Sequence, residues 1–456
     1  MMVHNQTSAE GVSMEQVVSV VGGGLAGCEC ALQLARRGVS VRLYEQRPLH
    51  ESPAHHGGGF AELVCSNSLK STKEDTAAGQ LKWELGRLGC VLLECAHASS
   101  VPAGGALAVD RDDFSSRVGA LIEAHPNIEV VRERVDSLPD GTAVIAAGPL
   151  CSGELFDAIS RAVGGERMSF FDAAAPIVDA LSIDRSVVFE QSRYQKDATG
   201  DYLNCPLDRD DYDLFVNEVV GADRVLARDF EQRDLFCACQ PIEEVARTGH
   251  DTLRHGALKP VGILDPRTGS RPWAVVQLRA ENSAHTAYNL VGFQTNLTWP
   301  EQRRVFRLIP GLESAEFLRY GVMHRNSFVD TPHALDPTFR IPGTDVRLAG
   351  QITGTEGYVE AMASGLLAAL NVYADLTGAP AATLPETGSL GSLVRYATDP
   401  TTTDYQPMHV NFGLYPPLEN APRNKAARHA ALVGRARRDL EAFLLKRTDL
   451  FGTASS

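Results

Sequence analysis

The chain has 456 residues, of which 44% are hydrophobic and 22% are charged, and its formal net charge is −14 at pH 7. This length and composition are typical of a globular protein with two domains and a large buried core. The acidic balance argues against a surface that attracts nucleic acid everywhere. Because no run of about 18 apolar residues occurs, we expect no membrane-spanning helix and no membrane partner.

The N-terminal segment and the cysteines both indicate a cytoplasmic protein. Residues 1–14 are polar and lack the apolar core of a secretory signal, so we expect a flexible tail there and a second one at 449–456. Nine cysteines are scattered along the chain without paired CxxC clusters. Their odd number and their spacing favour free thiols over a disulfide framework and argue against a metal site.

The first predicted elements form a β-α-β unit. Residues 17–21 (VVSVV) are a β-branched run typical of a buried parallel strand, and the turn GGGLAG follows at 22–27. Residues 28–38 (CECALQLARRG) predict a helix that ends at a glycine, and residues 39–45 (VSVRLYE) predict the second strand.

The turn matches the G-x-G-x-x-G pattern of dinucleotide-binding sites. Gly22 permits a tight turn, Gly24 lets the backbone approach a pyrophosphate, and Gly27 allows close packing of helix and strand. Glu45 ends the second strand, where an acid accepts hydrogen bonds from ribose hydroxyls. A methyltransferase that binds S-adenosylmethionine is the alternative user of such a turn. The predicted cofactor contacts in this unit are Gly22, Gly23, Gly24, Leu25, Ala26, Gly27 and Glu45.

Two later segments predict further buried strands of the same sheet. They are residues 142–149 (TAVIAAGP) and 346–354 (VRLAGQITG), and a helical pattern follows the second at 356–376. Between them, short strand-like pieces alternate with polar loops, which predicts an α+β segment set between two parts of one α/β domain.

The predicted architecture is therefore a Rossmann-like domain with an insertion. Residues 15–169 and 341–448 make up the two parts of the α/β domain, and residues 170–340 make up the inserted α+β domain. Residues 421–447 carry eight Lys/Arg against two Asp/Glu at helical spacing. A solvated face on a C-terminal helix is the simplest interpretation, although a basic patch can hold phosphates on an acidic protein.

Residues 61–71 (AELVCSNSLKS) place Cys65 where an apolar run meets a polar one. The segment that follows resembles a helix start, which with Lys70 would lower the pKa of the thiol. His55 and His56 lie upstream and could exchange protons with it. The alternative is a small buried cysteine in a capping turn.

The segment PAHHGGGFAELVCSNSLKS, which follows VVGGGLAGCECALQLARRGVSVRLYEQRP, closely resembles the folate- and FAD-dependent tRNA uridine-54 C5-methyltransferases. The resemblance runs in matching order from Val17 to Leu445. Flavoproteins that modify the tRNA wobble uridine are also similar, but the CSNS and MHRN strings favour the methyltransferases. Further matching strings are SRYQKDATGDYLNCPL, CQPIEEVARTGHDTLRHGALKPVGI, WAVVQLRAEN, NLVGFQTNLTWPEQ, RYGVMHRNSF, AGQITGTEGYVEA and QPMHVNFGLYPP.

The resemblance implies FAD in the dinucleotide site, with Gly350 among its contacts. It also implies 5,10-methylenetetrahydrofolate as the methylene donor and NADH or NADPH as the reductant. Uracil C5 becomes nucleophilic once a thiolate has added to C6, and a base must then remove the C5 proton. By resemblance Cys65 is the nucleophile and Cys239 is the base or its partner, with the reverse order open. The FCAC string at 236–239 and the GGG string at 57–59 depart from the family pattern.

The resemblance predicts a methyltransferase that forms 5-methyluridine at position 54 of the tRNA T arm. The alternatives are the same chemistry on a 23S rRNA uridine, a non-catalytic RNA-binding flavoprotein and a small-molecule oxidoreductase. Arg279 and Lys259 are candidate contacts for tRNA or folate. We expect Cys205 to pack in a core, and we expect all three tryptophans to be core residues rather than base-stacking platforms.

Overall fold

The structure is a computed structural model that describes most of the chain. The described residues are 16–51, 55, 57–151, 153–164, 168–173, 175–194, 200–225, 240–321, 323–402 and 405–451, without the side chains of 168–173 and 323–325. Cys239, His56 and residues 1–15 lie outside this description. Residues 449–451, which we placed in a C-terminal tail, belong to a short helix, α14 (Thr448–Phe451).

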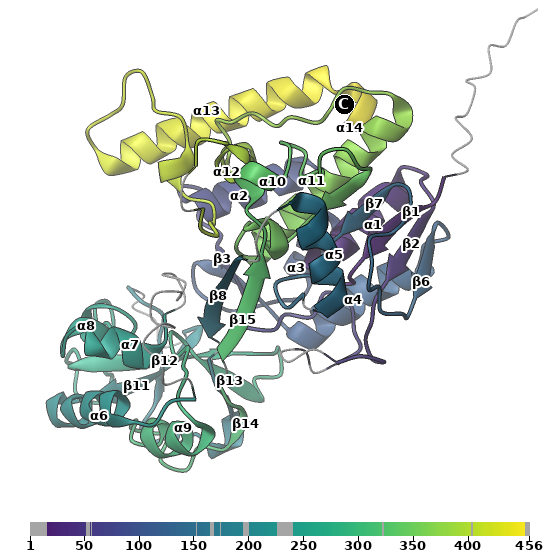
Figure 1. Ribbon diagram of the computed structural model, residues 1–456. Coiled ribbons are helices and arrows are strands. Elements are labelled where there is room, and N and C mark those ends of the chain that lie inside the picture. The colour runs from purple at the N-terminus through teal and green to yellow at the C-terminus, as the bar shows by residue number, and fades with distance from the viewer. Residues whose placement is uncertain are drawn as a thin grey trace, which may run out of the picture.

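A five-stranded parallel sheet forms the centre of the larger domain (Figure 1). The strand order is β16-β7-β1-β2-β6, and every neighbouring pair is parallel. Strand β16 comes from the C-terminal part of the chain and pairs with β7, so the two ends of the sequence complete one sheet. This confirms the predicted Rossmann-like domain. The strands are β1 (Val18–Val21), β2 (Val41–Tyr44), β6 (Ile128–Val131), β7 (Ala143–Ile145) and β16 (Val346–Leu348).

Two helices pack closely at the centre of this domain. The first, α1 (Leu25–Arg36), follows the glycine-rich turn, and α11 (Tyr358–Thr377) follows β16. A Cβ atom at Gly365 of α11 would lie 2.1 Å from the carbonyl oxygen of Ala26, so the two backbones touch there. The other helices of this domain are α2 (Ala77–Arg87), α3 (Val91–Ala98), α4 (Arg111–Ala124), α5 (Gly153–Val163), α10 (Thr331–Ala334), α12 (Ser389–Thr398) and α13 (Lys425–Lys446).

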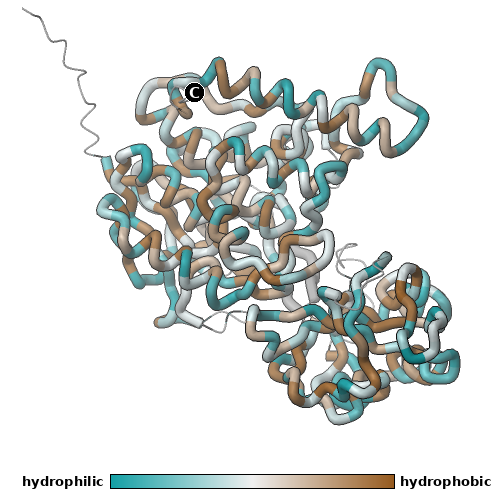
Figure 2. The backbone as a smooth tube through the Cα atoms, turned by 180° about the vertical axis from the view of Figure 1, so that it is seen from behind, coloured by the Kyte–Doolittle hydropathy of each residue, from teal (hydrophilic) through white to brown (hydrophobic). Residues whose placement is uncertain are grey.

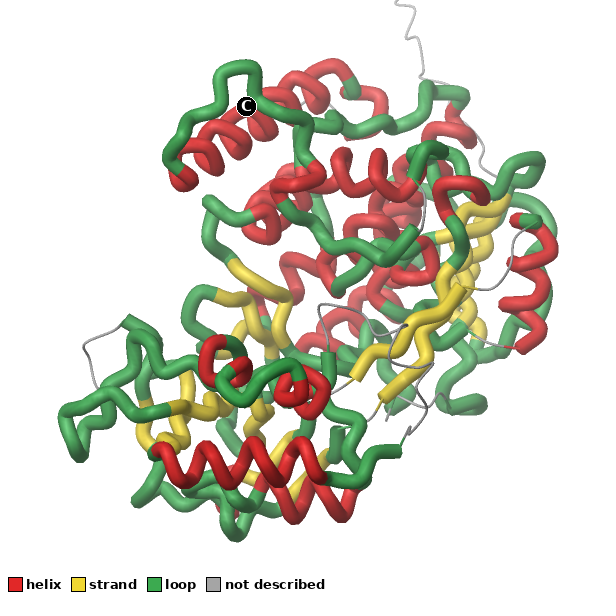
Figure 3. The backbone as a smooth tube through the Cα atoms, turned by 60° about the vertical axis from the view of Figure 1, so that its left-hand side comes forward, coloured by secondary structure: helices red, strands yellow, loops and turns green. Residues whose placement is uncertain are grey.

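The inserted domain has its own antiparallel sheet and its own hydrophobic core. Its strand order is β10-β11-β12-β13-β9-β14. Figure 3 shows this second group of strands and helices apart from the helix-rich larger domain. Cys205 is fully buried in its core, as expected. The elements are β9 (Ile177–Asp179), β10 (Phe189–Glu190), β11 (Tyr202–Leu207), α6 (Arg209–Gly221), α7 (Ile242–Arg247), α8 (Thr252–His255), β12 (Ala274–Ala280), β13 (Ala287–Leu290), α9 (Trp299–Phe306) and β14 (Phe317–Arg319).

Two smaller sheets complete the architecture. Strands β8 (Met168–Ala173) and β15 (Met323–Phe328) pair antiparallel and run between the two domains (Figure 1). Strands β3 (Ser68–Ser71), β5 (Ala106–Val109) and β4 (Ser100–Val101) form a three-stranded sheet. Three short 3₁₀ helices occupy Ala180–Ser182, Gln351–Thr353 and Phe412–Leu414.

The C-terminal helix α13 is amphipathic, as its sequence predicts. Figure 2 shows apolar and polar residues alternating along it. Leu432, Val433, Ala436 and Leu440 are buried against the domain, whereas Lys425 and the residues around it are exposed. No helix within the described ranges is long and apolar enough to span a bilayer.

The contact between α1 and α11 yields a stability prediction. Replacing Gly365 by Ala places a methyl group against the α1 backbone, so we expect a loss of about 1–3 kcal/mol in the free energy of unfolding, measured by urea denaturation. Gly86→Ala in α2 is the matched control, because its new Cβ would have no atom within 4 Å. The control should gain about 0.5–1 kcal/mol, since alanine is the better helix former. Equal stability of the two variants would contradict the close approach.

Candidate cofactor and thiol site

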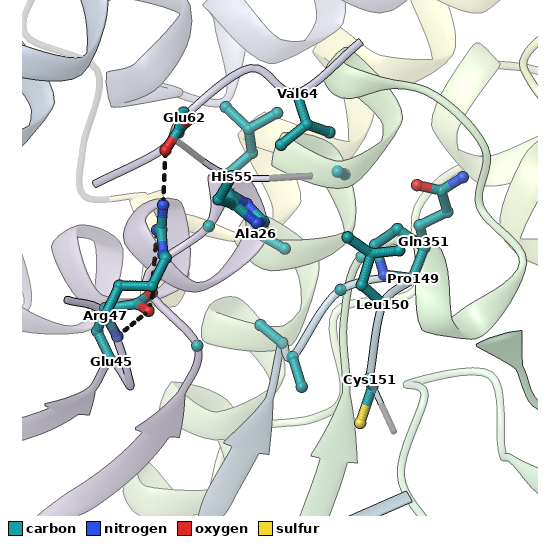
Figure 4. Close-up of a pocket in the computed structure, with 18 of the residues that line it drawn as sticks. Ala26, Glu45, Arg47, His55, Glu62, Val64, Pro149, Leu150, Cys151 and Gln351 are labelled. Atoms are coloured by element: carbon teal, nitrogen blue, oxygen red, sulfur yellow. Dashed lines mark hydrogen bonds and ion pairs between the residues drawn. The ribbon is translucent and has the colours of Figure 1, made fainter. Parts of the chain in front are cut away.

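A cavity of about 620 Å³ opens at the carboxyl ends of β1, β2 and β7. Its walls come from the glycine-rich turn, the segment after β2, residues 62–70, the loop after β7 and the start of α11. Figure 4 shows side chains from these separate segments turned toward one space, including Glu45, His55 and Gln351. Ligands bind at this end of parallel sheets in open α/β folds.

The glycine-rich turn has the geometry that its sequence predicts. Gly22 has a φ of +106°, and a Cβ there would lie 2.4 Å from the Ala146 carbonyl oxygen. A Cβ at Gly27 would lie 1.8 Å from the Gly22 carbonyl oxygen. With any larger residue at this position the helix could not approach the strand as closely as it does. A Cβ at Gly24 would have no atom within 4 Å, and Gly24 caps α1 without a side-chain hydrogen bond. The turn therefore leaves open space beside unpaired helix amides, which suits a pyrophosphate.

Glu45 is held as a buried acceptor at the cavity wall. It is 5% exposed, and its Oε2 accepts a hydrogen bond from the Gly23 amide at 2.9 Å. The Arg47 guanidinium donates to both of its oxygens, at 3.0 and 3.2 Å. Burial raises the pKa of Glu45, but the hydrogen bonds and charge of Arg47 outweigh it and hold the pKa below the usual value. A carboxylate kept ionised in this way suits ribose hydroxyls.

Arg47 continues this network toward the thiol segment, a link that the sequence did not reveal. Its Nη1 donates to Glu62 Oε2 at 2.9 Å, and the pair is drawn in Figure 4. Arg47 is 4% exposed, so its charge is neutralised by the two carboxylates rather than by water. Gly350, the predicted contact from β16, also lines the cavity, and its amide donates to Ser364 Oγ at 2.7 Å.

Cys65 lines the same cavity and is the partly exposed member of the seven described cysteines. Burial raises the pKa values of Cys28, Cys30, Cys90 and Cys205, which makes those thiols poor nucleophiles. Cys151, which we had not singled out, also reaches the cavity wall but is buried. Our alternative of a buried structural thiol at Cys65 is therefore wrong.

The expected helix start after Cys65 is also wrong, because the segment enters strand β3 instead. Asn67 is fully buried, and its Nδ2 donates to the carbonyl oxygens of Val109 at 3.0 Å and Ala280 at 2.9 Å. These partners satisfy its polar groups in an extended conformation, so no helix cap forms. Lys70 does not face the thiol through a helix, and its Nζ pairs with Glu360 Oε1 at 2.9 Å.

Two arginines donate hydrogen bonds to the backbone carbonyl groups at Cys65 and just before it. Arg111, at the start of α4, donates to the carbonyl oxygens of Leu63 and Cys65, the second at 2.9 Å. Arg319, at the end of β14, donates to the carbonyl oxygen of Val64 at 2.6 Å. Because β14 belongs to the inserted domain, both domains hold this short segment.

A third arginine holds the residues that follow. Arg279 of β12 donates from Nε to Asn67 Oδ1 and from Nη2 to Ser66 Oγ, both at 2.8 Å. It is 6% exposed, and burial lowers its pKa. We predicted Arg279 as a contact for tRNA or folate, but the structure places it against the protein. We call Arg111, Arg279 and Arg319 the arginine clamp.

The arginine clamp surrounds Cys65 with three guanidinium groups, of which Arg111 also pairs with the buried Glu281 carboxylate. Each of the three guanidinium groups interacts electrostatically with Cys65. The Cys65 amide donates to the Tyr358 hydroxyl at 2.7 Å, which ties the segment to the first residue of α11. Positive charge around a thiol favours the nucleophilic thiolate.

The other sequence candidates lie in different places. His55 lines the cavity, as does Asn326 of the MHRN string, whereas Lys259 is exposed on the inserted domain. Trp83 and Trp273 are partly buried against the two cores, close to our expectation. Trp299 is 58% exposed, so its predicted core role is wrong.

Comparisons with known proteins agree with this geometry. The family model "Glucose inhibited division protein A" matches residues 17–380. A Geobacter sulfurreducens protein named methylenetetrahydrofolate–tRNA-(uracil-5-)-methyltransferase TrmFO is 54% identical over 94% of this chain and 99% of its own length. A Moorella thermoacetica protein of the same name is 51% identical over 93% and 97%.

Solved structures agree on the fold. Aquifex aeolicus GidA superposes with a TM-score of 0.67 at 16% identity, over 96% of this chain and 75% of that one. The sequence matches are the more specific finding, because they extend over nearly the full length of both chains. The chain belongs to the TrmFO family, within the wider glucose-inhibited division protein A group.

Proposed function

We propose that this protein forms 5-methyluridine at position 54 of the tRNA T arm, in the cytoplasm, with the methylene group taken from 5,10-methylenetetrahydrofolate. The names and high identity of its relatives support this activity. The observation that carries the proposal is Cys65, a partly exposed thiol on the wall of a dinucleotide-type cavity and among three guanidinium groups.

The residues around the cavity fit FAD. The open space at Gly24 and the uncapped α1 start would hold the pyrophosphate, Glu45 would accept the ribose hydroxyls, and Gly350 would lie along the cofactor. When bound, FAD supplies the methylene carrier and the hydride, which the folate and NADH or NADPH replenish.

Cys65 performs the first covalent step on uracil. Its thiolate adds to C6, and the electron pair of the C5–C6 double bond moves toward O4, which makes C5 nucleophilic. After C5 has formed its new carbon–carbon bond, a base removes the C5 proton and the Cys65 sulfur leaves C6 with its electron pair. Cys239 is our prediction for this base or its partner, and it lies outside the described residues.

The exposed face of α13 supports RNA as the substrate. Lys425, Arg428 and Arg438 of α13 and Arg423 just before it are exposed, and none forms an ion pair with another described residue. Arg437 of the same helix instead pairs with Glu74 at 3.1 Å. Unpaired cations gathered on a protein of net charge −14 are suited to phosphates rather than to another acidic surface patch.

The activity is tested by mass spectrometry of tRNA and 23S rRNA from a strain that lacks the gene. Loss of 5-methyluridine from the T arm alone is the expected result. Unchanged T-arm methylation together with a missing 23S rRNA methyl group would move the same chemistry to ribosomal RNA.

Cys65→Ala should abolish methyl transfer to a tRNA transcript while FAD stays bound, because the nucleophile is lost but the dinucleotide site is intact. Methyl transfer is followed with labelled methylenetetrahydrofolate, and FAD by absorbance of the purified protein. Cys95→Ala in α3 is the control and should remain active. An active Cys65→Ala variant would refute the assignment.

Arg279→Gln should make Cys65 less reactive. Removing one buried positive charge from the arginine clamp disfavours the thiolate, so the pH midpoint of Cys65 alkylation should rise by roughly one pH unit. Iodoacetamide labelling followed by peptide mass spectrometry reports this midpoint. Arg267→Gln is the control, since Arg267 pairs with Asp265 on the same domain. Equal midpoints in the two variants would contradict an electrostatic role for Arg279.

Glu45→Gln should weaken FAD binding by roughly 10- to 100-fold, because an amide replaces a charged acceptor and leaves Arg47 short of a partner. Fluorescence titration of the apoprotein with FAD measures the dissociation constant. Glu129→Gln is the control, because Glu129 forms an exposed pair with Arg42 on the neighbouring strands. Unchanged FAD affinity in Glu45→Gln would remove Glu45 from the cofactor site.

A further inference from the structure

Three aromatic rings are stacked on the inserted domain. Trp299 and Tyr320 have ring centroids 5.4 Å apart, and Tyr320 and Phe317 have centroids 5.2 Å apart, with interplanar angles of 16° in both pairs. Trp299 ends the stack and is 58% exposed. We call these three residues the aromatic stack. None of them is among the described residues that line the cofactor cavity.

A cation is fixed beside the aromatic stack. Arg303 lies one turn after Trp299 in α9 and donates from Nε and Nη2 to the Tyr320 hydroxyl, at 2.9 and 2.7 Å. Its guanidinium carbon is 5.8 Å from the Tyr320 ring centroid. Within the described part of the chain Arg303 has no carboxylate partner, whereas the adjacent Arg304 pairs with Glu301 and Glu218. The charge of Arg303 is therefore available to an anion.

The aromatic stack is joined to the thiol segment by the chain itself. Arg319 stands between Phe317 and Tyr320 in the sequence, and its guanidinium donates to the carbonyl oxygen of Val64, the residue before Cys65. The Gln302 amide group also exchanges hydrogen bonds with the backbone of Gly321, at 2.7 and 2.8 Å, which fixes the start of α9 to the end of this segment. The rings and the thiol segment are thus joined through Arg319 and the Gln302–Gly321 hydrogen bonds.

A flat, exposed indole with a neighbouring cation matches the chemistry of an unpaired nucleotide. Single-stranded RNA is recognised by stacking of bases on aromatic rings and by cations on its phosphates. A thiol can reach C6 of a uracil in a folded arm only after that base has left its stack, which leaves neighbouring bases without a partner. The aromatic stack offers them a replacement surface beside the reacting segment.

We propose that Trp299, Tyr320 and Phe317, with Arg303 beside them, bind an unpaired nucleobase of the RNA substrate and its adjacent phosphate. The inference rests on the proposed function only in taking RNA as the substrate. Trp299 supplies the open face, the two inner rings keep it flat and in place, and Arg303 contacts the phosphate.

The test measures binding of a synthetic T-arm hairpin RNA to the FAD-loaded protein. Trp299→Ala should raise the dissociation constant roughly tenfold, since stacking of one base contributes a factor of about 5 to 150. Trp299→Phe should restore most of the affinity because it keeps a stacking face. Leu264→Ala, which removes an exposed apolar side chain from the loop before β12, is the control and should bind like the unmodified protein.

Two further measurements identify the ligand. Hairpins with single abasic positions should lose their sensitivity to Trp299→Ala at the position whose base stacks there, which a double-mutant cycle detects. Arg303→Ala should lower the slope of log affinity against log salt concentration by about one, as expected for one lost phosphate contact.

Equal RNA affinity of Trp299→Ala and the unmodified protein would overturn the inference, as would absence of hairpin binding by the unmodified protein. If Trp299→Ala instead weakens binding of methylenetetrahydrofolate without RNA, the ring serves the folate and the inference is wrong. These outcomes are separate from the proposed function: a protein that binds the hairpin through Trp299 but transfers no methyl group would refute the methyltransferase and leave the aromatic stack assigned.

Discussion

The contact on which the site depends is the arginine clamp across the two domains. Arg279 and Arg319 extend from the sheet of the inserted domain, and Arg111 extends from α4 of the larger domain. All three converge on residues 63–67. Backbone carbonyl oxygens, the Ser66 hydroxyl and the Asn67 side-chain amide accept most of their hydrogen bonds, and Glu281 is the carboxylate that pairs with Arg111, so three guanidinium groups face one described carboxylate here. Burying these guanidinium groups costs desolvation free energy, but it places positive charge beside Cys65.

The placement of cations also explains how a chain with a net negative charge can bind an anionic substrate. Several cations of the inserted domain are paired with carboxylates, as in the Arg267–Asp265 and Arg304–Glu301 pairs. Among the described cations without such a partner are those on the exposed face of α13 and Arg303 at the edge of the aromatic stack. Positive charge that is confined to local patches favours one orientation of a bound RNA over binding anywhere on the surface.

The sequence predicts those elements whose stabilising interactions join residues close together along the chain. The β-α-β unit and the glycine turn were correct because their interactions span about twenty residues, as in the Gly23 amide bond to Glu45. The helix expected after Cys65 was wrong because the partners of Asn67 lie 42 and 213 residues away, at Val109 and Ala280. Those distant carbonyl oxygens decide between a helix cap and a strand, and no local pattern contains them.

The same reasoning applies to the tryptophans and the clamp. The local sequence does not show that Trp299 stacks on Tyr320, which in turn stacks on Phe317, while Trp299 stays 58% exposed. Arg279 sits in a strand whose residues are all buried, a pattern that predicts a core position rather than a charged clamp. Family resemblance predicts Cys65 as the nucleophile, but the groups that surround it became visible only in three dimensions.

A continuous polar path joins the cofactor cavity to the inserted domain. Glu45 faces the dinucleotide site and holds Arg47, and Arg47 pairs with Glu62 at the start of the thiol segment. From there the segment passes into the arginine clamp and, through Arg319, to the strand that carries the aromatic stack. The Glu45–Arg47–Glu62 contacts and the Arg319 contact with Val64 are buried or half-buried charged hydrogen bonds, and the backbone from Glu62 to Val64 joins them. The cofactor cavity, the thiol segment and the strand that carries the aromatic stack are therefore connected by one series of contacts.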